Sequence, residues 1–90
     1  MKFYTANLTS GQSITLAAAD NVMQFTFKVA SSSSGTFKGN GTFQGSSVNA
    51  TQSLAAGDGF SAVATNPMSP IEGITLTCTS GTIIVTIGTT

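Results

Sequence analysis

The chain has 90 residues and a formal net charge of zero, and only 7% of its residues are charged, against about a quarter in ordinary domains. Its basic residues are lysines scattered along the chain, and neither arginine nor histidine occurs. Because phosphate backbones and anionic lipids are bound by clustered lysines and arginines, this composition argues against nucleic-acid binding and against an electrostatic membrane anchor. A surface with so little charge suits a protein that is largely covered by identical copies or by a partner, although a secreted or surface-exposed β domain could simply be polar and uncharged.

The N-terminal third of the chain predicts three strands, because apolar and polar residues alternate there with a period of two. We expect strands over residues 1–8, 13–16 and 22–30, with a turn after the first and a loop over residues 17–21. The side chains predicted to face inward in these strands are Tyr4, Ala6, Leu8, Ile14, Leu16, Met23, Phe25, Phe27 and Val29.

Two similar hexapeptides fill residues 35–46, Gly-Thr-Phe-Lys-Gly-Asn followed by Gly-Thr-Phe-Gln-Gly-Ser. A solenoid would need three or more copies, so a hairpin explains the pair better. A loop of residues 39–41 would place Phe37 opposite Phe43, and aromatic cross-strand pairs stabilise hairpins. A two-residue turn at Asn40-Gly41 is the competing register, and it would not pair the two phenylalanines directly.

Residues 48–54 and 60–64 predict two further short strands, separated by a glycine-containing turn. Pro67 and Pro70 then mark a loop, because each proline lacks a backbone donor and restricts the residue before it. Either of their preceding peptide bonds could be cis.

The C-terminal segment carries the strongest pattern in the chain. Residues 74–78 and 83–87 both alternate apolar with mostly threonine positions, and Ser80-Gly81 supplies a turn between them, so we expect adjacent antiparallel strands in a hairpin. The residues of these runs that should be buried are Ile74, Leu76, Cys78, Ile83, Val85 and Ile87. The whole pattern predicts a single all-β domain over residues 1–90, a β-sandwich or jelly-roll-like arrangement of about eight short antiparallel strands.

Ile84 is out of phase with its apolar neighbours, so it should lie on the opposite face of its strand, beside Thr82 and Thr86. The terminal strand is also apolar, uncharged and free of proline, as is a sheet edge that pairs with another chain unless it is protected. We therefore expect Ile84, Thr82 and Thr86 to lie in or beside a contact with a second copy or with a partner. The alternative is an internal strand of a two-sheet sandwich.

Few side chains are available for chemistry. Asp20, Asp58 and Glu72 are the only carboxylates, and each lies in a turn containing glycine or asparagine, where acidic residues commonly bond to nearby backbone. Cys78 is the only cysteine, and we expect a buried side chain rather than a nucleophile, since no histidine could activate it. We therefore expect a non-enzymatic protein with no catalytic residue, no cofactor and no resident metal, although Asp20 or Asp58 could touch a calcium ion.

Four stretches of the chain resemble the small β-rich structural proteins of tailed-phage virions. They are residues 11–16 (Gly-Gln-Ser-Ile-Thr-Leu), 54–60 (Leu-Ala-Ala-Gly-Asp-Gly-Phe), 71–76 (Ile-Glu-Gly-Ile-Thr-Leu) and 80–85 (Ser-Gly-Thr-Ile-Ile-Val). The resemblance implies a capsid decoration or cement protein that binds the major capsid protein on the virion surface. Many such proteins are trimers, so the resemblance also implies a homo-oligomer.

Two alternatives stay open. A tail or head-fibre component would have the same style of sequence, and a carbohydrate-binding or adhesive β module would belong to another class. Tyr4 and the phenylalanines are the candidates for a sugar-binding face, although phenylalanines at alternating strand positions are more often in the core and the chain has no tryptophan. No apolar segment follows the initial Met-Lys pair, so we expect synthesis in the host cytoplasm without a signal peptide.

Overall fold

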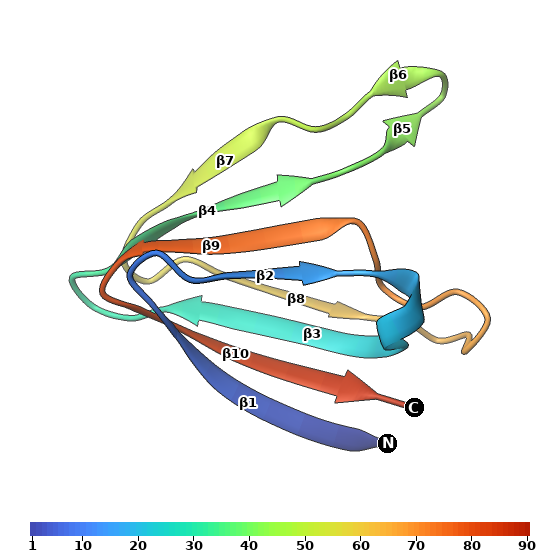
Figure 1. Cartoon of the computed structure of the whole chain (residues 1–90), viewed down its shortest axis with the longest axis horizontal. Helices are drawn as coiled ribbons and strands as arrows, with labels where there is room; N and C mark the ends of the chain where they lie inside the picture. The colour runs from blue at the N-terminus through green and yellow to red at the C-terminus, as the bar shows by residue number, and fades with distance from the viewer.

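The computed structural model describes all of residues 1–90 and shows two four-stranded antiparallel sheets in two layers (Figure 1). Sheet A contains, in spatial order, β1 (Lys2–Thr9), β10 (Thr82–Thr89), β3 (Val22–Val29) and β8 (Gly59–Val63). Sheet B contains, in spatial order, β2 (Ser13–Leu16), β9 (Ile74–Ser80), β4 (Ser34–Gly39) and β7 (Thr51–Leu54). The remaining elements are a hairpin of β5 (Thr42–Phe43) and β6 (Ser46–Ser47) and a 3-10 turn, η1 (Ala18–Asp20).

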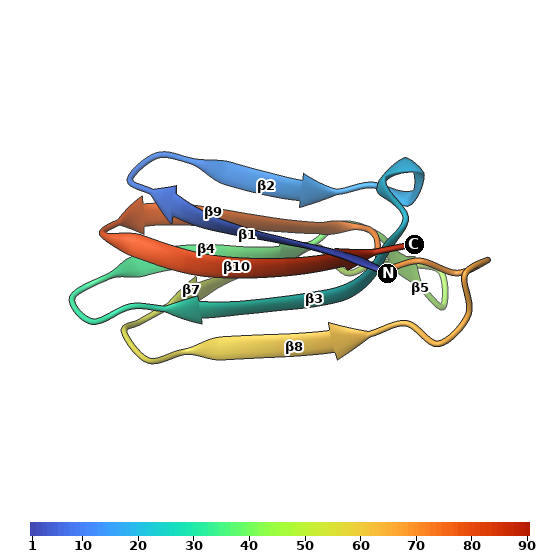
Figure 2. The ribbon, with the colours of Figure 1, turned by 90° about the horizontal axis from the view of Figure 1, so that it is seen from below.

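The chain passes repeatedly between the two sheets, and only β4 and β7 are successive strands of the sandwich in the same sheet. The resulting orders, β1-β10-β3-β8 and β2-β9-β4-β7, are those of a jelly roll, in which eight strands form two Greek keys. Figure 2 looks onto sheet A, with β8, β3, β10 and β1 in succession. The prediction of an all-β sandwich or jelly-roll-like fold is therefore confirmed.

The core lies between the sheets and consists of the side chains that alternation placed on the inner faces. Eleven buried residues form one cluster, and the largest fully enclosed members include Phe25, Leu76 and Ile83. The predicted burial of Cys78, Val85, Phe27 and Val29 is also confirmed, whereas Ile74 and Ile87 are only half-buried.

The predicted hairpin of residues 74–87 is wrong. β9 pairs with β2 and β4, while β10 pairs with β1 and β3, so the Ser80-Gly81 turn carries the chain from sheet B to sheet A. Ser33 closes this turn from the adjacent loop, since its Oγ accepts a 2.9 Å hydrogen bond from the backbone N–H of Thr82. The alternation correctly identified one buried face for each strand, but the two faces pack against each other across the core.

Neither hairpin register considered for the two hexapeptides is found, because β4 pairs with β7 and β9 and not with β5, and so Phe37 does not pair with Phe43. Phe37 lies on the inner face of β4, opposite Gln52 and Leu76, whereas Phe43 is 64% exposed in the β5–β6 hairpin. That hairpin turns at Gln44-Gly45, whose φ angles of 52° and 82° fit a type I′ turn. The segment after β4 instead stays beside sheet B, where the Asn40 N–H donates to the Gly73 carbonyl over 2.7 Å.

β10 is a central strand, contrary to the expectation of an exposed terminal edge. β1 and β3 pair with it on either side, and Lys2 lies opposite Thr89, so the two ends of the chain are neighbours (Figure 1). The edges of sheet A are β1 and β8. The peptide bonds before Pro67 and Pro70 are trans. The only helical element is the three-residue η1, so no helix in the chain is long enough to cross a bilayer.

Candidate functional site

The outer face of sheet A is a broad surface with a single charged side chain, that of Lys28. The strand registers arrange its residues in three rows across β1, β10, β3 and β8. The rows are Phe3, Gly88, Gln24 and Val63; Thr5, Thr86, Thr26 and Ser61; and Asn7, Ile84, Lys28 and Gly59. Because Lys28 is the only charged side chain on this face, a protein partner could cover the rest of it at little cost in desolvated charge.

Ile84 is the largest apolar side chain on the two central strands of this face. It is 46% exposed and lies between Asn7 and Lys28 in the cross-strand row. The groove beside it has a volume of about 570 Å³ and is lined mainly by the ends of β3 and the loop before β8. Thr82 and Thr86 lie on the same face and are half-buried. The predicted outward orientation of Ile84 is therefore confirmed, and its role in an interface stays a prediction.

Two more exposed apolar residues on this face were not included in the predicted interface. Phe3 is 59% exposed on β1, and Val63 is 65% exposed on β8, and the register places them at the two ends of one row. The alternation in residues 1–8 had already put Phe3 on the outer side. An aromatic residue in an outward position was the signal that could have identified it.

The outer face of sheet B differs from that of sheet A because it presents hydroxyl groups and no large apolar side chain. Its pairs include Ser13 with Thr77, at 2.8 Å between their oxygens, and Thr15 with Thr75, at 3.2 Å. Lys38 is the only charged residue on this face. Because these hydroxyl groups already bond to each other, they would gain few new hydrogen bonds if a partner covered this face.

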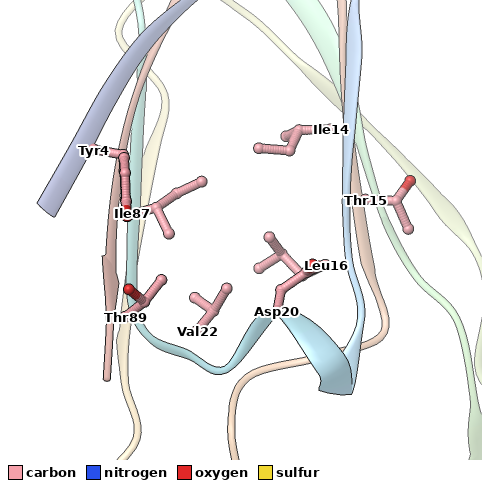
Figure 3. A pocket seen from close by; sticks show the side chains of 8 residues that line it. All are labelled: Tyr4, Ile14, Thr15, Leu16, Asp20, Val22, Ile87 and Thr89. Carbon is pink, nitrogen blue, oxygen red and sulfur yellow. The ribbon is translucent and has the colours of Figure 1, made fainter. Parts of the chain in front are cut away.

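A hollow of about 520 Å³ opens between the sheets at the edge formed by β1 and β2. Figure 3 shows Ile14 and Leu16 projecting from β2 toward Ile87 and Tyr4, whereas Thr15 points away. Tyr4 is 55% exposed here, and Ala6 is exposed as well, so the predicted burial of both is wrong. β1 diverges from β2 toward its N-terminal end (Figure 1), and of its residues only Leu8, beside the turn to β2, is buried.

A second, smaller hollow of about 260 Å³ lies at the opposite edge, between β7 and β8. Three phenylalanines surround it, with ring centroids 5.6 Å apart for Phe27 and Phe37 and 5.1 Å apart for Phe37 and Phe60. Phe60 is 40% exposed, whereas Phe27 belongs to the core. These rings therefore close the open end of the sandwich by packing on each other.

The carboxylates of Asp20 and Asp58 stabilise turns, as their sequence context predicts. One oxygen of Asp20 accepts the N–H of Ala17 over 3.0 Å, and one oxygen of Asp58 accepts the N–H of Ala55 over 2.8 Å. Cys78 is fully buried, and its sulfur lies 3.5 Å from the Gly81 carbonyl oxygen. Nowhere in the chain do three histidine, cysteine, aspartate or glutamate side chains come together in a group that could hold a metal ion.

The sequence matches no family model, and neither the curated proteins nor the solved structures provide a match.

Proposed function

We propose that this protein is a non-enzymatic structural component of a virion, namely a capsid decoration or cement protein that docks on the major capsid protein. The observation that carries the proposal is the outer face of sheet A, where Ile84 is exposed on a central strand of a surface with one charged residue. The resemblance of the sequence to small β-rich virion proteins supports the choice of partner.

Protein–protein interfaces commonly have an apolar centre surrounded by a polar rim, and the surface around Ile84 has this composition. Complete burial of an isoleucine side chain contributes about 1.5–3 kcal/mol, and Ile84 still has 46% of its surface to lose. The threonines and Asn7 around it are able to form hydrogen bonds at the rim. An interface of this kind needs about 800 Å² from each partner, so it would extend from Ile84 toward Phe3 and Val63.

The change Ile84→Lys should abolish binding to particles while leaving the isolated chain folded. The lysine would be solvated on the free protein, but docking would bury its charge without a partner. Co-sedimentation with purified particles measures binding, and thermal unfolding measures the fold. Thr79→Lys, at an exposed position of a central strand of sheet B, is the matched control and should bind normally. Normal binding by Ile84→Lys, or failure of this variant to fold, would contradict the interface assignment.

The copy number in purified particles tests the wider proposal. A number comparable to that of the major capsid protein supports a shell component, because a decoration protein follows the capsid lattice. A few copies in each particle would place the protein in the tail or in a fibre. Absence from purified particles would contradict a role in the virion altogether.

A carbohydrate-binding role is the second candidate, and the hollow between β1 and β2 favours it. Tyr4 offers a half-exposed ring there, and Asp20 and Thr89 line the same hollow with polar atoms. Tyr4→Ala should weaken sugar binding about two- to tenfold, since a stacked ring contributes about 0.5–1.5 kcal/mol. Phe3→Ala, a similarly exposed ring on the opposite face of the same strand, should leave it unchanged. Titration against a panel of oligosaccharides provides the measurement, and absence of binding by the unaltered chain would exclude this role.

A further inference from the structure

β1 is an unprotected edge strand. With eight residues it is the longest of the strands at the sheet edges, since β8 has five and β2 and β7 have four each. It carries no proline, its pairing with β10 shows no bulge, and its only charge is that of Lys2 at one end. Figure 1 shows it along the lower margin of the molecule with no strand beyond it. Natural edge strands are normally protected from pairing by a proline, a bulge or charged side chains along the strand. Apart from Lys2 at one end, β1 has none of these features, which points to a partner strand.

The hydrogen bonds at the end of β1 establish which of its backbone groups are free. The Thr9 N–H donates to Oε1 of Gln12 over 2.8 Å, and the carbonyl of its register partner Thr82 accepts the N–H of Ala30 over 3.1 Å. Thr9 and Thr82 are therefore a non-hydrogen-bonded pair. Because bonded and non-bonded pairs alternate in an antiparallel ladder, the even-numbered residues of β1 bond to β10. The N–H and C=O groups of Phe3, Thr5 and Asn7 consequently point away from the sheet.

These free groups have a self-complementary arrangement. We propose that a second copy of this chain pairs with β1 in antiparallel fashion, about a two-fold axis at Thr5. Thr5 then lies opposite its own counterpart, and Phe3 lies opposite Asn7 of the second copy. Each of the three residues donates one hydrogen bond and accepts one, so every free backbone group of the edge is satisfied. Sheet A becomes continuous across the two copies.

The side chains agree with this register. A two-fold axis perpendicular to the sheet keeps inner residues beside inner residues, so Tyr4 meets Ala6 of the second copy while Phe3 packs beside the neutral Asn7. The two Lys2 side chains lie at opposite ends of the ladder, each opposite Leu8, so like charges do not meet. Phe3 and Tyr4 are 59% and 55% exposed in the single chain, and pairing would remove part of that apolar surface from water.

Cysteine cross-linking tests the register directly. Facing residues of a hydrogen-bonded pair have Cα atoms about 5.5 Å apart, within the range that a disulfide spans. Thr5→Cys should therefore form a covalent dimer with itself when the folded protein is oxidised with glutathione disulfide. Phe3→Cys and Asn7→Cys should each cross-link poorly alone and well when mixed. The native Cys78 is fully buried and does not interfere.

Ser61→Cys is the matched control, because Ser61 occupies the same row as Thr5 but on β8, the opposite edge of sheet A. It should stay monomeric under the same conditions. Cross-linking of Ser61→Cys as complete as that of Thr5→Cys would overturn the assignment to β1. Self-linking of Phe3→Cys equal to that in the mixture would overturn the proposed axis.

The mass in solution tests the association itself. The unaltered chain, of 9.1 kDa, should show the mass of a dimer in sedimentation equilibrium. Thr5→Pro removes an outward N–H and no bond to β10, so it should give a monomer with an unchanged circular dichroism spectrum. Thr5→Lys, which places two ammonium groups opposite each other, should weaken the dimer by up to about fivefold. Ser61→Lys should dimerise normally.

A monomeric mass for the unaltered chain at the highest attainable concentration would overturn the proposal, as would a dimer that persists in both Thr5 variants. Ile84→Lys distinguishes this inference from the proposed docking face. The Ile84 side chain lies on the face of sheet A and not at its edge, so this variant should lose particle binding and still dimerise.

Discussion

Replacing Leu76 by alanine should lower the free energy of unfolding by about 2–5 kcal/mol. Leu76 has no exposed surface. In the strand register it lies between Ile14 of β2 and Phe37 of β4. The substitution removes packed methyl groups and leaves a cavity that two flanking strands prevent from closing. Urea unfolding followed by circular dichroism measures the change as a shift of the midpoint at constant slope.

Thr79→Ala is the control for this measurement, because Thr79 lies on the same strand with its side chain exposed. It should change the stability by no more than about 0.5 kcal/mol. A loss below that value for Leu76→Ala would show that the core between the sheets is not closely packed around this residue.

The change Gly35→Ala should destabilise the fold by about 1–3 kcal/mol or prevent folding. A Cβ atom at Gly35 would collide with the carbonyl oxygen of Thr77 and would lie 2.7 Å from Cδ1 of Ile83. The first of these is backbone of the neighbouring strand β9, and the second is a fully buried core side chain. Neither can move without disturbing the pairing of β4 with β9 or the packing between the sheets.

Gly39→Ala, on the same strand, separates this steric effect from the general effect of replacing glycine. A Cβ there would meet only the Val48 carbonyl oxygen, at an ordinary contact distance of 3.7 Å. This variant should be neutral or more stable by about 0.4–1 kcal/mol, since alanine lowers the entropy of the unfolded chain. Equal stabilities for Gly35→Ala and Gly39→Ala would contradict the close approach of β4, β9 and the core.

The sequence predicted the buried faces of the strands well, because alternation is a local property that each strand carries by itself. It did not predict which strands are neighbours. Ile74–Ser80 and Thr82–Thr89 follow each other closely, yet they belong to different sheets, and the short turn at Ser80-Gly81 is equally compatible with a hairpin and with a crossing between layers. Packing of the whole chain decides between the two, and a local pattern carries no information on it.

The sequence likewise predicted the orientation of the candidate interface residue Ile84, which is a local property, but not the position of its strand in the sheet. The outward position of Ile84 follows from its phase within one strand, and the structure confirms it. The idea that the terminal strand is an open edge depended on its neighbours, and it was wrong. The actual edge, β1, was predicted as a strand, but burial was assigned to Tyr4 and Ala6 because the pattern could not reveal that an open hollow separates β1 from β2 and leaves both side chains exposed.

The central position of β10 has a consequence for how the chain folds. Its partners are the first strand and the third, so residues as distant along the chain as Lys2 and Thr89 must meet before sheet A is complete. The chain loses the conformational entropy of closing this long loop before the pairing of β1 with β10 can stabilise the fold. We expect the chain to fold in milliseconds to seconds, which is the range typical of sandwiches dominated by non-local pairing. β1 and β3 become joined in one sheet only when the last strand, β10, inserts between them.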